Sequence, residues 1–187
     1  MGDKMRRYDL IRALGLTAMM VCAMPALAGP EAPVKTIMDL AAAMSSNTAP
    51  PGADYFDKDH IGLFSKGFIA AYDEARKYSY LEDGGVFEYD VITNSQEGCP
   101  LKDISIAPGP DAAGASKVEV TFKLMACYQD ETVSEVHFKV VTERGKPVIS
   151  DIDRIVDGKP VSLMDEMKDI AKEGAAAPAD QQEPQPQ

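Results

Sequence analysis

The sequence predicts an α+β fold in which two or three N-terminal helices pack on a curved antiparallel sheet of about five strands, followed by a C-terminal helix. Up to about residue 80, apolar residues recur at intervals of three and four, as on one face of a helix. After Gly85 they alternate with polar residues, as in strands that bury a single face. Because a run of helices is followed by a run of strands, the helices are expected to cover the apolar face of the sheet.

Two N-terminal segments carry the helical pattern. Apolar residues from Val34 to Met44 fall at i, i+3, i+4, i+7 and i+10, which predicts a helix of about three turns. The second segment, Asp54–Tyr80, has an apolar stripe interrupted by Gly67, and this predicts two short helices with a bend between them. Asp57 is expected to cap the first of these two helices with its carboxylate.

Five segments alternate between apolar and polar residues. The clearest is Val118–Tyr128, in which apolar side chains occupy every second position. Glu143–Lys146 is expected to form a hairpin turn, and Asp157–Pro160 to break the last strand. The expected strands are Val86–Thr93, Leu101–Ala107, Val118–Tyr128, Thr132–Thr142 and Pro147–Val156.

The C-terminal part is predicted to contain a helix and a tail. Ser162 is expected to cap the helix, with Asp165 at the third helical position as in a capping box. Gly174 is expected to end it. Residues 174–187 are rich in Pro and Gln, which predicts a disordered tail, so that 29–173 form a single domain.

The N-terminus has the three parts of a secretory signal peptide. Basic residues come first, an uncharged and largely apolar run follows from Ala13 to Met24, and Ala26 and Ala28 supply the small residues of a cleavage site. The apolar run is shorter than the ~20 residues of a membrane span. We therefore expect residues 1–28 to be removed, leaving a periplasmic or secreted protein with no stable membrane anchor.

Removing the leader also removes Cys22, one of the three cysteines. The remaining pair, Cys99 and Cys127, is expected to form a disulfide, because an even number of cysteines in an exported protein favours pairing. The bridge would close a loop of about 29 residues and contribute about 3–4 kcal/mol in the chain-entropy model. Two cysteines this far apart do not form the C-x-x-C motif of a redox pair.

The composition excludes several classes of function. The chain carries 30 acidic and 19 basic residues, a formal net charge of −11. This balance repels nucleic acids and anionic membrane surfaces and favours a basic protein partner. A hydrophobic fraction of 45% over 187 residues is enough for a core, which excludes a fully disordered chain.

Four stretches carry a family resemblance: Tyr55–Asp57 at a helix start, Tyr89–Gln96, the strand Val118–Met125, and Pro147–Ile152. Through them the segment Val34–Glu173 resembles the nuclear transport factor 2-like superfamily, a cystatin-like α+β cone, and in particular its exported bacterial members of unknown function. The resemblance implies a curved sheet with a pocket on its concave face. Because the superfamily contains isomerases, cyclases, dehydratases and non-enzymatic binding modules, it implies a fold more than an activity.

Within such a cone, Asp90 is the candidate catalytic residue. It points away from the side of Tyr89 and Val91, and pocket enzymes of this superfamily use a carboxylate or a histidine as general base. The alternative is a solvent-facing or turn-bonding aspartate. Aromatic residues are the candidate ligand-binding side chains, with core packing as the alternative: Tyr55, Tyr72, Tyr89 and Phe122.

No metal or cofactor is expected. The chain has no P-loop, no dinucleotide-binding glycine pattern, no H-E-x-x-H and no serine nucleophile motif. Asp151 and Asp153 begin a segment that resembles a calcium loop, but Ile155 occupies a ligand position and the glycine comes two residues late. His60 is expected at a helix start and His137 on the sheet surface.

Three functions are compatible with these observations. The first is an exported non-enzymatic binding module for a small apolar ligand or a protein partner. The second is a pocket enzyme of the isomerase or cyclase type, with Asp90 as its base. The third is an immunity-type inhibitor that blocks a toxic enzyme in the cell envelope.

Overall fold

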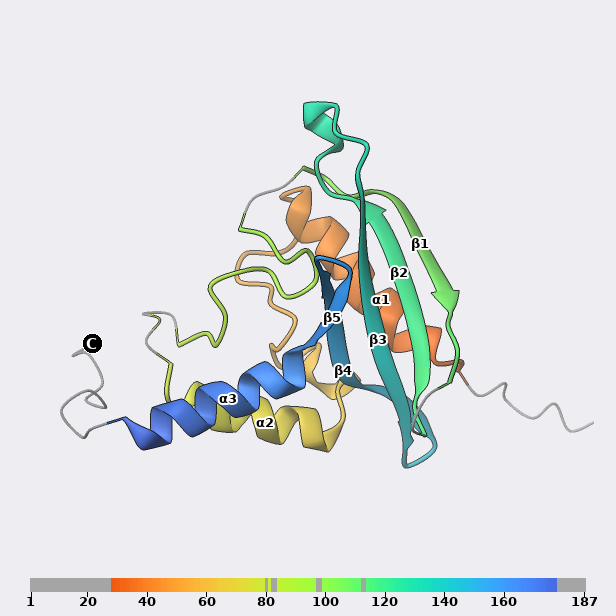
Figure 1. The fold of residues 1–187 in the computed structure, drawn as a ribbon. Coiled ribbons are helices and arrows are strands. Elements are labelled where there is room, and N and C mark those ends of the chain that lie inside the picture. The colour runs from red at the N-terminus through yellow and green to blue at the C-terminus, as the bar shows by residue number, and fades with distance from the viewer. Residues whose placement is uncertain (1–27, 80, 82–83, 97–98, 112–113, 178–187) are drawn as a thin grey trace, which may run out of the picture.

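The computed structural model describes residues 28–79, 81, 84–96, 99–111 and 114–177 (Figure 1). Its fold is α+β, as predicted, with helices before and after a five-stranded antiparallel sheet. The helices are α1 (Glu31–Ser45), η1 (Ile61–Leu63), α2 (Lys66–Arg76), η2 (Ala126–Tyr128) and α3 (Leu163–Ala176), of which η1 and η2 are short 3-10 helices. The strands are β1 (Lys102–Pro108), β2 (Ser116–Lys123), β3 (Val133–Glu143), β4 (Lys146–Val156) and β5 (Lys159–Ser162). Except for Ala28, the predicted leader lies outside the described residues, as does the tail beyond residue 177.

The sheet is a meander in which consecutive strands are neighbours, in the order β1-β2-β3-β4-β5. Alternate connections of an antiparallel meander lie at the same end of the sheet. The β2–β3 connection, which contains η2, and the β4–β5 turn therefore share one end, here called the apical end. At this end the η2 segment projects beyond the rest of the molecule (Figure 1).

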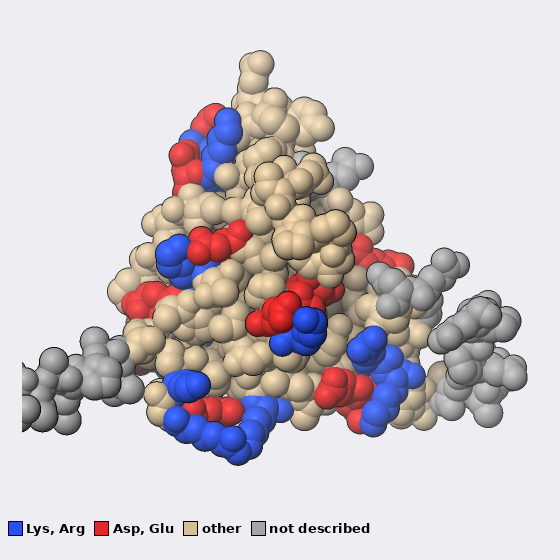
Figure 2. Space-filling view, turned by 180° about the vertical axis from the view of Figure 1, so that it is seen from behind, with Lys and Arg blue, Asp and Glu red and all other residues tan. Residues whose placement is uncertain are grey.

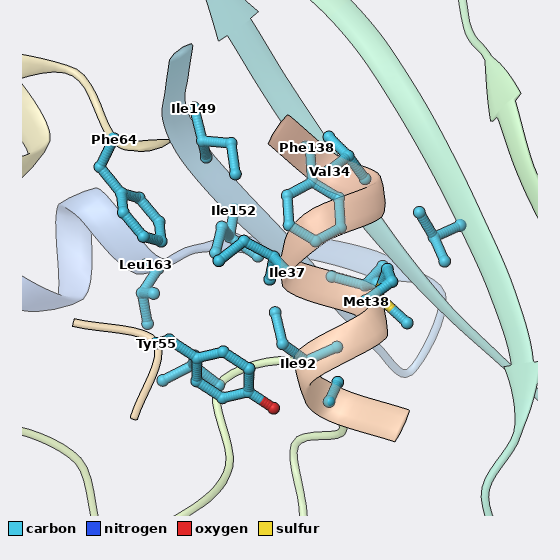
Figure 3. Packing of buried hydrophobic residues seen from close by; sticks show 14 of the residues in the cluster. Val34, Ile37, Met38, Tyr55, Phe64, Ile92, Phe138, Ile149, Ile152 and Leu163 are labelled. Atoms are coloured by element: carbon cyan, nitrogen blue, oxygen red, sulfur yellow. The ribbon is translucent and has the colours of Figure 1, made fainter. Parts of the chain in front are cut away.

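The inner face of the sheet is covered by helices. From α1, the fully buried residues Val34, Ile37 and Met38 join the same cluster as Phe138 of β3 and Ile152 of β4 (Figure 3). The helices α2 and α3 lie side by side, and both contact β4 (Figure 1). Side chains of α1 thus occupy the concave side of the sheet, where burial of each large apolar side chain contributes about 1.5–3 kcal/mol.

A bulge in β4 brings two aliphatic residues to the same face. The register with β3 shifts between Lys139 and Val140, which leaves Ser150 as the extra residue. Without the bulge, Ile149 and Ile152 would point to opposite faces, whereas both are fully buried. The Ser150 hydroxyl donates to the Lys139 carbonyl at 3.1 Å, which holds the bulge in place.

The prediction of a strand over Val86–Thr93 is wrong. Residues 91–94 form a turn, and Asp90 makes only an isolated bridge. The Asp90 carboxylate accepts hydrogen bonds from the backbone N–H groups of Ile92 and Thr93, at 2.9 and 2.8 Å. Such local bonding competes with strand pairing, and here it decides the backbone conformation.

Two further strand boundaries differ from the prediction. The predicted break at Asp157–Pro160 contains the start of β5, because Asp157 and Gly158 form a two-residue hairpin turn with φ of 51° and 74°. The long strand predicted for Val118–Tyr128 ends at Lys123 and is followed by η2. The other three predicted strands correspond to β1, β3 and β4.

The start of α2 also differs. Asp57 does not cap a helix; its carboxylate accepts from the backbone N–H groups of Asp59 and His60, within a turn that precedes η1. The cap of α2 is Ser65, whose hydroxyl accepts from the N–H of Phe68 at 3.1 Å. The bend that was expected at Gly67 therefore lies earlier in the chain, between η1 and α2.

The start of α3 is the predicted one, but its end is not. The Ser162 hydroxyl accepts from the N–H of Asp165 at 3.1 Å, which confirms the cap. The helix continues through Gly174 to Ala176. Gly174 serves packing instead, because a Cβ placed on it would lie 2.4 Å from the side chain of Tyr78.

Candidate functional site

The most exposed large apolar side chains of the described residues gather near the apical end of the sheet. Tyr128 in η2 is 71% exposed, and Val133 at the start of β3 is 58% exposed. The full set is Ile104, Tyr128, Val133, Val156 and Val161, and each lies in the apical half of the sheet or beyond it. Ile104 and Val161 lie on the two edge strands, β1 and β5, whereas the two most exposed residues, Tyr128 and Val133, both lie near the β2–β3 connection and are the candidates for one interaction surface.

The predicted disulfide anchors this region. Cys99 is bonded to Cys127 of η2, with the two Cα atoms 5.7 Å apart, which confirms the pairing. The Cys99 N–H also donates to the Leu124 carbonyl at 2.9 Å. The projecting segment is thus held on the side of β1 as well as by its own strands, and an interaction surface held in this way loses less conformational entropy on binding.

An open pocket of about 380 Å³ lies at the apical end, and we call it the apical notch. Its lining consists of residues 92–94 and 133–135 together with Phe122, Arg154, Ile155 and Gly158. The notch therefore shares Val133 with the exposed apolar set. Its volume is at the lower end of the range of about 300–1,000 Å³ found for small-molecule pockets.

Arg154 lines the notch and is only 7% exposed. Its Nη1 donates to Asn94 Oδ1 at 2.6 Å, its Nη2 forms an ion pair with Glu166 of α3, and its Cζ lies 4.5 Å from the centre of the Tyr89 ring. These contacts tie the loop before β1, the end of β4 and the start of α3 together. Its Nε is buried and has no hydrogen-bond partner among the described residues.

Tyr89 completes this arrangement. Its hydroxyl donates to the carboxylate of Glu166, at 2.7 Å from Oε1 and 2.8 Å from Oε2. Burial raises the pKa of Tyr89 well above its usual value, and the hydrogen bond to Glu166 raises it further, while Arg154 opposes the shift. The neutral phenol is therefore a donor at any physiological pH, and Tyr89 acts as a positioning residue for Arg154.

The candidate base Asp90 is engaged in structural bonds. Besides the two backbone N–H groups of its turn, it accepts from the Tyr55 hydroxyl, with 2.7 Å between Oδ2 and the phenol oxygen. Burial and then the charge of Asp90 raise the pKa of Tyr55. Asp90 does not line the notch. Its contacts match the turn-bonding alternative considered above.

The four aromatic candidates do not line one pocket. Phe122 lines the notch, and Tyr89 reaches it indirectly through Arg154. Tyr55 is buried and bonded to Asp90, while Tyr72 is buried in α2 with its ring centre 4.5 Å from that of Phe56. Tyr55 and Tyr72 therefore have the surroundings of core residues.

Within the described ranges, no group of three or more His, Cys, Asp or Glu side chains is arranged to hold a metal ion. His60 Nδ1 lies 2.8 Å from Asp57 Oδ1, and His137 contacts Glu135 on the outer face of the sheet. The same part of the chain has no helix with the length and apolarity needed to cross a membrane.

The charged residues do not form a large patch of one sign on the face opposite to that of Figure 1. In Figure 2, they occur in small groups that mix both signs, with uncharged areas between them. The tip of the projecting segment is uncharged on this face (Figure 2). On this face the tip is thus free of charge, with charged groups below it.

Several residues of this region were not predicted. Arg154 occupies an inward position of a predicted strand, two residues after Ile152, and a charged residue at such a position is a signal for a buried ion pair. Tyr128 was expected to face inward because its strand was expected to continue. No pattern in the sequence identifies Asn94 or Glu166 as partners of Arg154, since 60 and 12 residues separate them from it.

Comparison with known proteins yields no match to this chain among family models, curated proteins or solved structures. The resemblance to the nuclear transport factor 2-like superfamily therefore rests on the four stretches named above.

Proposed function

We propose that this protein is an exported, non-enzymatic binding module that binds a protein partner through the apical end of its sheet. The observation that carries the proposal is the exposure at that end of Tyr128 and Val133, the two most exposed large apolar side chains of the described residues. Tyrosines anchored on a rigid support are frequent hot spots of protein interfaces. The disulfide supplies the rigidity.

The interior favours a protein partner over an enclosed apolar ligand. Side chains of α1 fill the concave side of the sheet, where a nuclear transport factor 2-like cone would hold its ligand. The notch at the apical end is open, and polar groups contribute much of its lining. The isomerase or cyclase alternative gains no support from Asp90, because three donors already occupy its carboxylate.

Export is part of the proposal. It is supported by the N-terminal pattern and by the disulfide, which persists in oxidising compartments. N-terminal sequencing of the protein isolated from its host is expected to begin at Gly29. A mature protein that still begins at Met1 would contradict export by this route.

The binding surface is tested with a double variant. The partner is captured from envelope extract, identified by mass spectrometry and purified, and its affinity is measured. Tyr128→Ser with Val133→Ser should weaken binding at least tenfold, since truncating each of two interface anchors costs more than about 1 kcal/mol. Thr142→Ala with Lys146→Ala, two exposed residues at the opposite end of the sheet, is the matched control. Equal affinities of the two double variants would exclude the apical end as the interface.

A further inference from the structure

The start of β3 has a neighbour on only one side. Val133 pairs with Lys123 of β2, but the pairing of β3 with β4 begins only at Val136, opposite Arg154. The ladder with β4 stops there although β4 itself continues to Val156, and the last two residues of β4 pair with β5. Residues 133–135 therefore form a short open edge, and all three line the apical notch.

An open edge of this kind presents backbone groups for pairing. In a β-ladder, alternate residues direct both their N–H and their C=O to the same side. At least one of the residues 133–135 therefore directs both groups into the notch, where β4 does not pair with them. Such unpaired backbone groups are a template for another strand, and several peptide-binding domains use them in this way.

The remaining walls of the notch indicate what kind of strand would fit. Val133 and Ile155 offer apolar contact for a side chain, whereas Phe122 is 1% exposed and belongs to the core. Arg154 also lines the notch, and its Nε is the buried side-chain polar atom without a hydrogen-bond partner among the described residues.

The charges around the notch indicate the sign of the partner. Glu135 lines the notch, exposed Asp130 lies on the projecting segment, and the β4–β5 turn carries one exposed acid and one exposed base, Asp157 and Lys159. Arg154 is already neutralised by Glu166, and Lys123 by Asp103 and Glu131. With a net charge of −11, the chain favours a segment that carries Lys or Arg.

We propose that the apical notch binds an extended, basic segment of a partner protein, which pairs with residues 133–135 as an added strand. The proposal rests on the proposed function and deepens it. An apolar side chain of the segment packs on Val133 and Ile155. Tyr128 contacts the same partner from the projecting segment.

The test uses a random seven-residue peptide library displayed on phage, selected against the full protein. Selected peptides should be rich in Lys or Arg and in β-branched residues. Synthetic copies should lose at least tenfold in affinity when the backbone nitrogen that pairs with β3 is methylated, because methylation removes the donor. Bound peptide should also slow amide hydrogen exchange at residues 133–135.

Two charge variants complete the design. Glu135→Lys should weaken the selected peptides about three- to tenfold, whereas Glu173→Lys, the same change on an exposed position of α3, should leave their affinity unchanged. The proposal of an added strand would be refuted if the selected peptides bound equally well after methylation of each backbone nitrogen. It would also be refuted if the library yielded no binder. If the added strand were refuted but binding of the purified partner still depended on Tyr128 and Val133, the proposed function would remain supported.

Discussion

Replacing Asp151 by alanine is expected to loosen the contact between α3 and the sheet. Asp151 lies in β4, is 7% exposed, and its carboxylate faces the start of α3. Oδ2 accepts from the Ser162 hydroxyl at 2.7 Å and from Lys139 Nζ at 2.9 Å, while Oδ1 accepts from the N–H of Met164 at 3.0 Å. One carboxylate thus supports the capping serine and satisfies a first-turn N–H group of the helix.

The magnitude follows from these contacts. Loss of an N-terminal cap costs about 1 kcal/mol, and loss of a hydrogen bond to a charged group about 1.5–3 kcal/mol. The Lys139 contact adds little, because its side chain is 41% exposed and keeps Asp153 as a partner. We expect Asp151→Ala to lower the free energy of unfolding by about 2–4 kcal/mol, which corresponds to about 4–16 °C in Tm.

Asp153 provides a matched control. It lies in the same strand, is 8% exposed and binds the same Lys139 Nζ, at 2.8 Å, but among the described residues it makes no hydrogen bond to α3. Asp153→Ala is therefore expected to cost about 1 kcal/mol. Urea unfolding followed by far-ultraviolet circular dichroism measures both, with the disulfide intact and the m-value unchanged. Equal losses in the two variants would refute the role of Asp151 at the start of α3.

Three further predictions concern packing, ionisation and the disulfide. Gly174→Ala should destabilise by about 1–3 kcal/mol in thermal unfolding, because its Cβ would overlap Tyr78; a gain of stability, as at an ordinary helix position, would contradict this contact. Since burial and the charge of Asp90 raise the pKa of Tyr55, the neutral phenol is favoured in the folded state, and the stability it contributes is lost as pH rises above about 10. Tyr55→Phe should flatten that decline by about 1.4 kcal/mol per pH unit, and an unchanged slope in alkaline urea titrations would contradict it. Cys99→Ser should lower stability by about 3–4 kcal/mol, matched by reduction of the parent protein; a variant as stable as the oxidised parent would exclude a structural role for the bridge.

The segment around Asp90 shows where sequence patterns misled. Alternation predicted a strand over Val86–Thr93, but the carboxylate of Asp90 bonds two backbone N–H groups just ahead of it and turns the chain. The alternation of apolar and polar residues reports which side chains are buried over several positions. A turn, by contrast, can be formed by a single carboxylate that bonds nearby backbone N–H groups. At Asp157-Gly158 the opposite happened: the Asp-Gly pair is typical of a two-residue hairpin turn, but the prediction there is a break in the chain.

The candidate site was predicted less well than the fold. Of the five candidate residues, Phe122 lines the notch and Tyr89 supports it, while Asp90, Tyr55 and Tyr72 have structural surroundings. The residues that define the apical end are exposed because neighbouring elements stop short of them. The exposure of the start of β3 depends on where its pairing with β4 ends. The alternation of apolar and polar residues does not predict that position.

The sequence by itself determined the α+β class, α1, four strands of the sheet apart from the end of β2, the Ser162 cap and the cysteine pair. Each of these depends on residues that are close together in the chain, or on a count over the whole chain. Only the tertiary structure decided that the start of β3 lacks a second neighbour and that Arg154 meets Asn94 and Glu166 beside it. Those features depend on strand register and on contacts between distant segments, which are set by the packing of the whole domain.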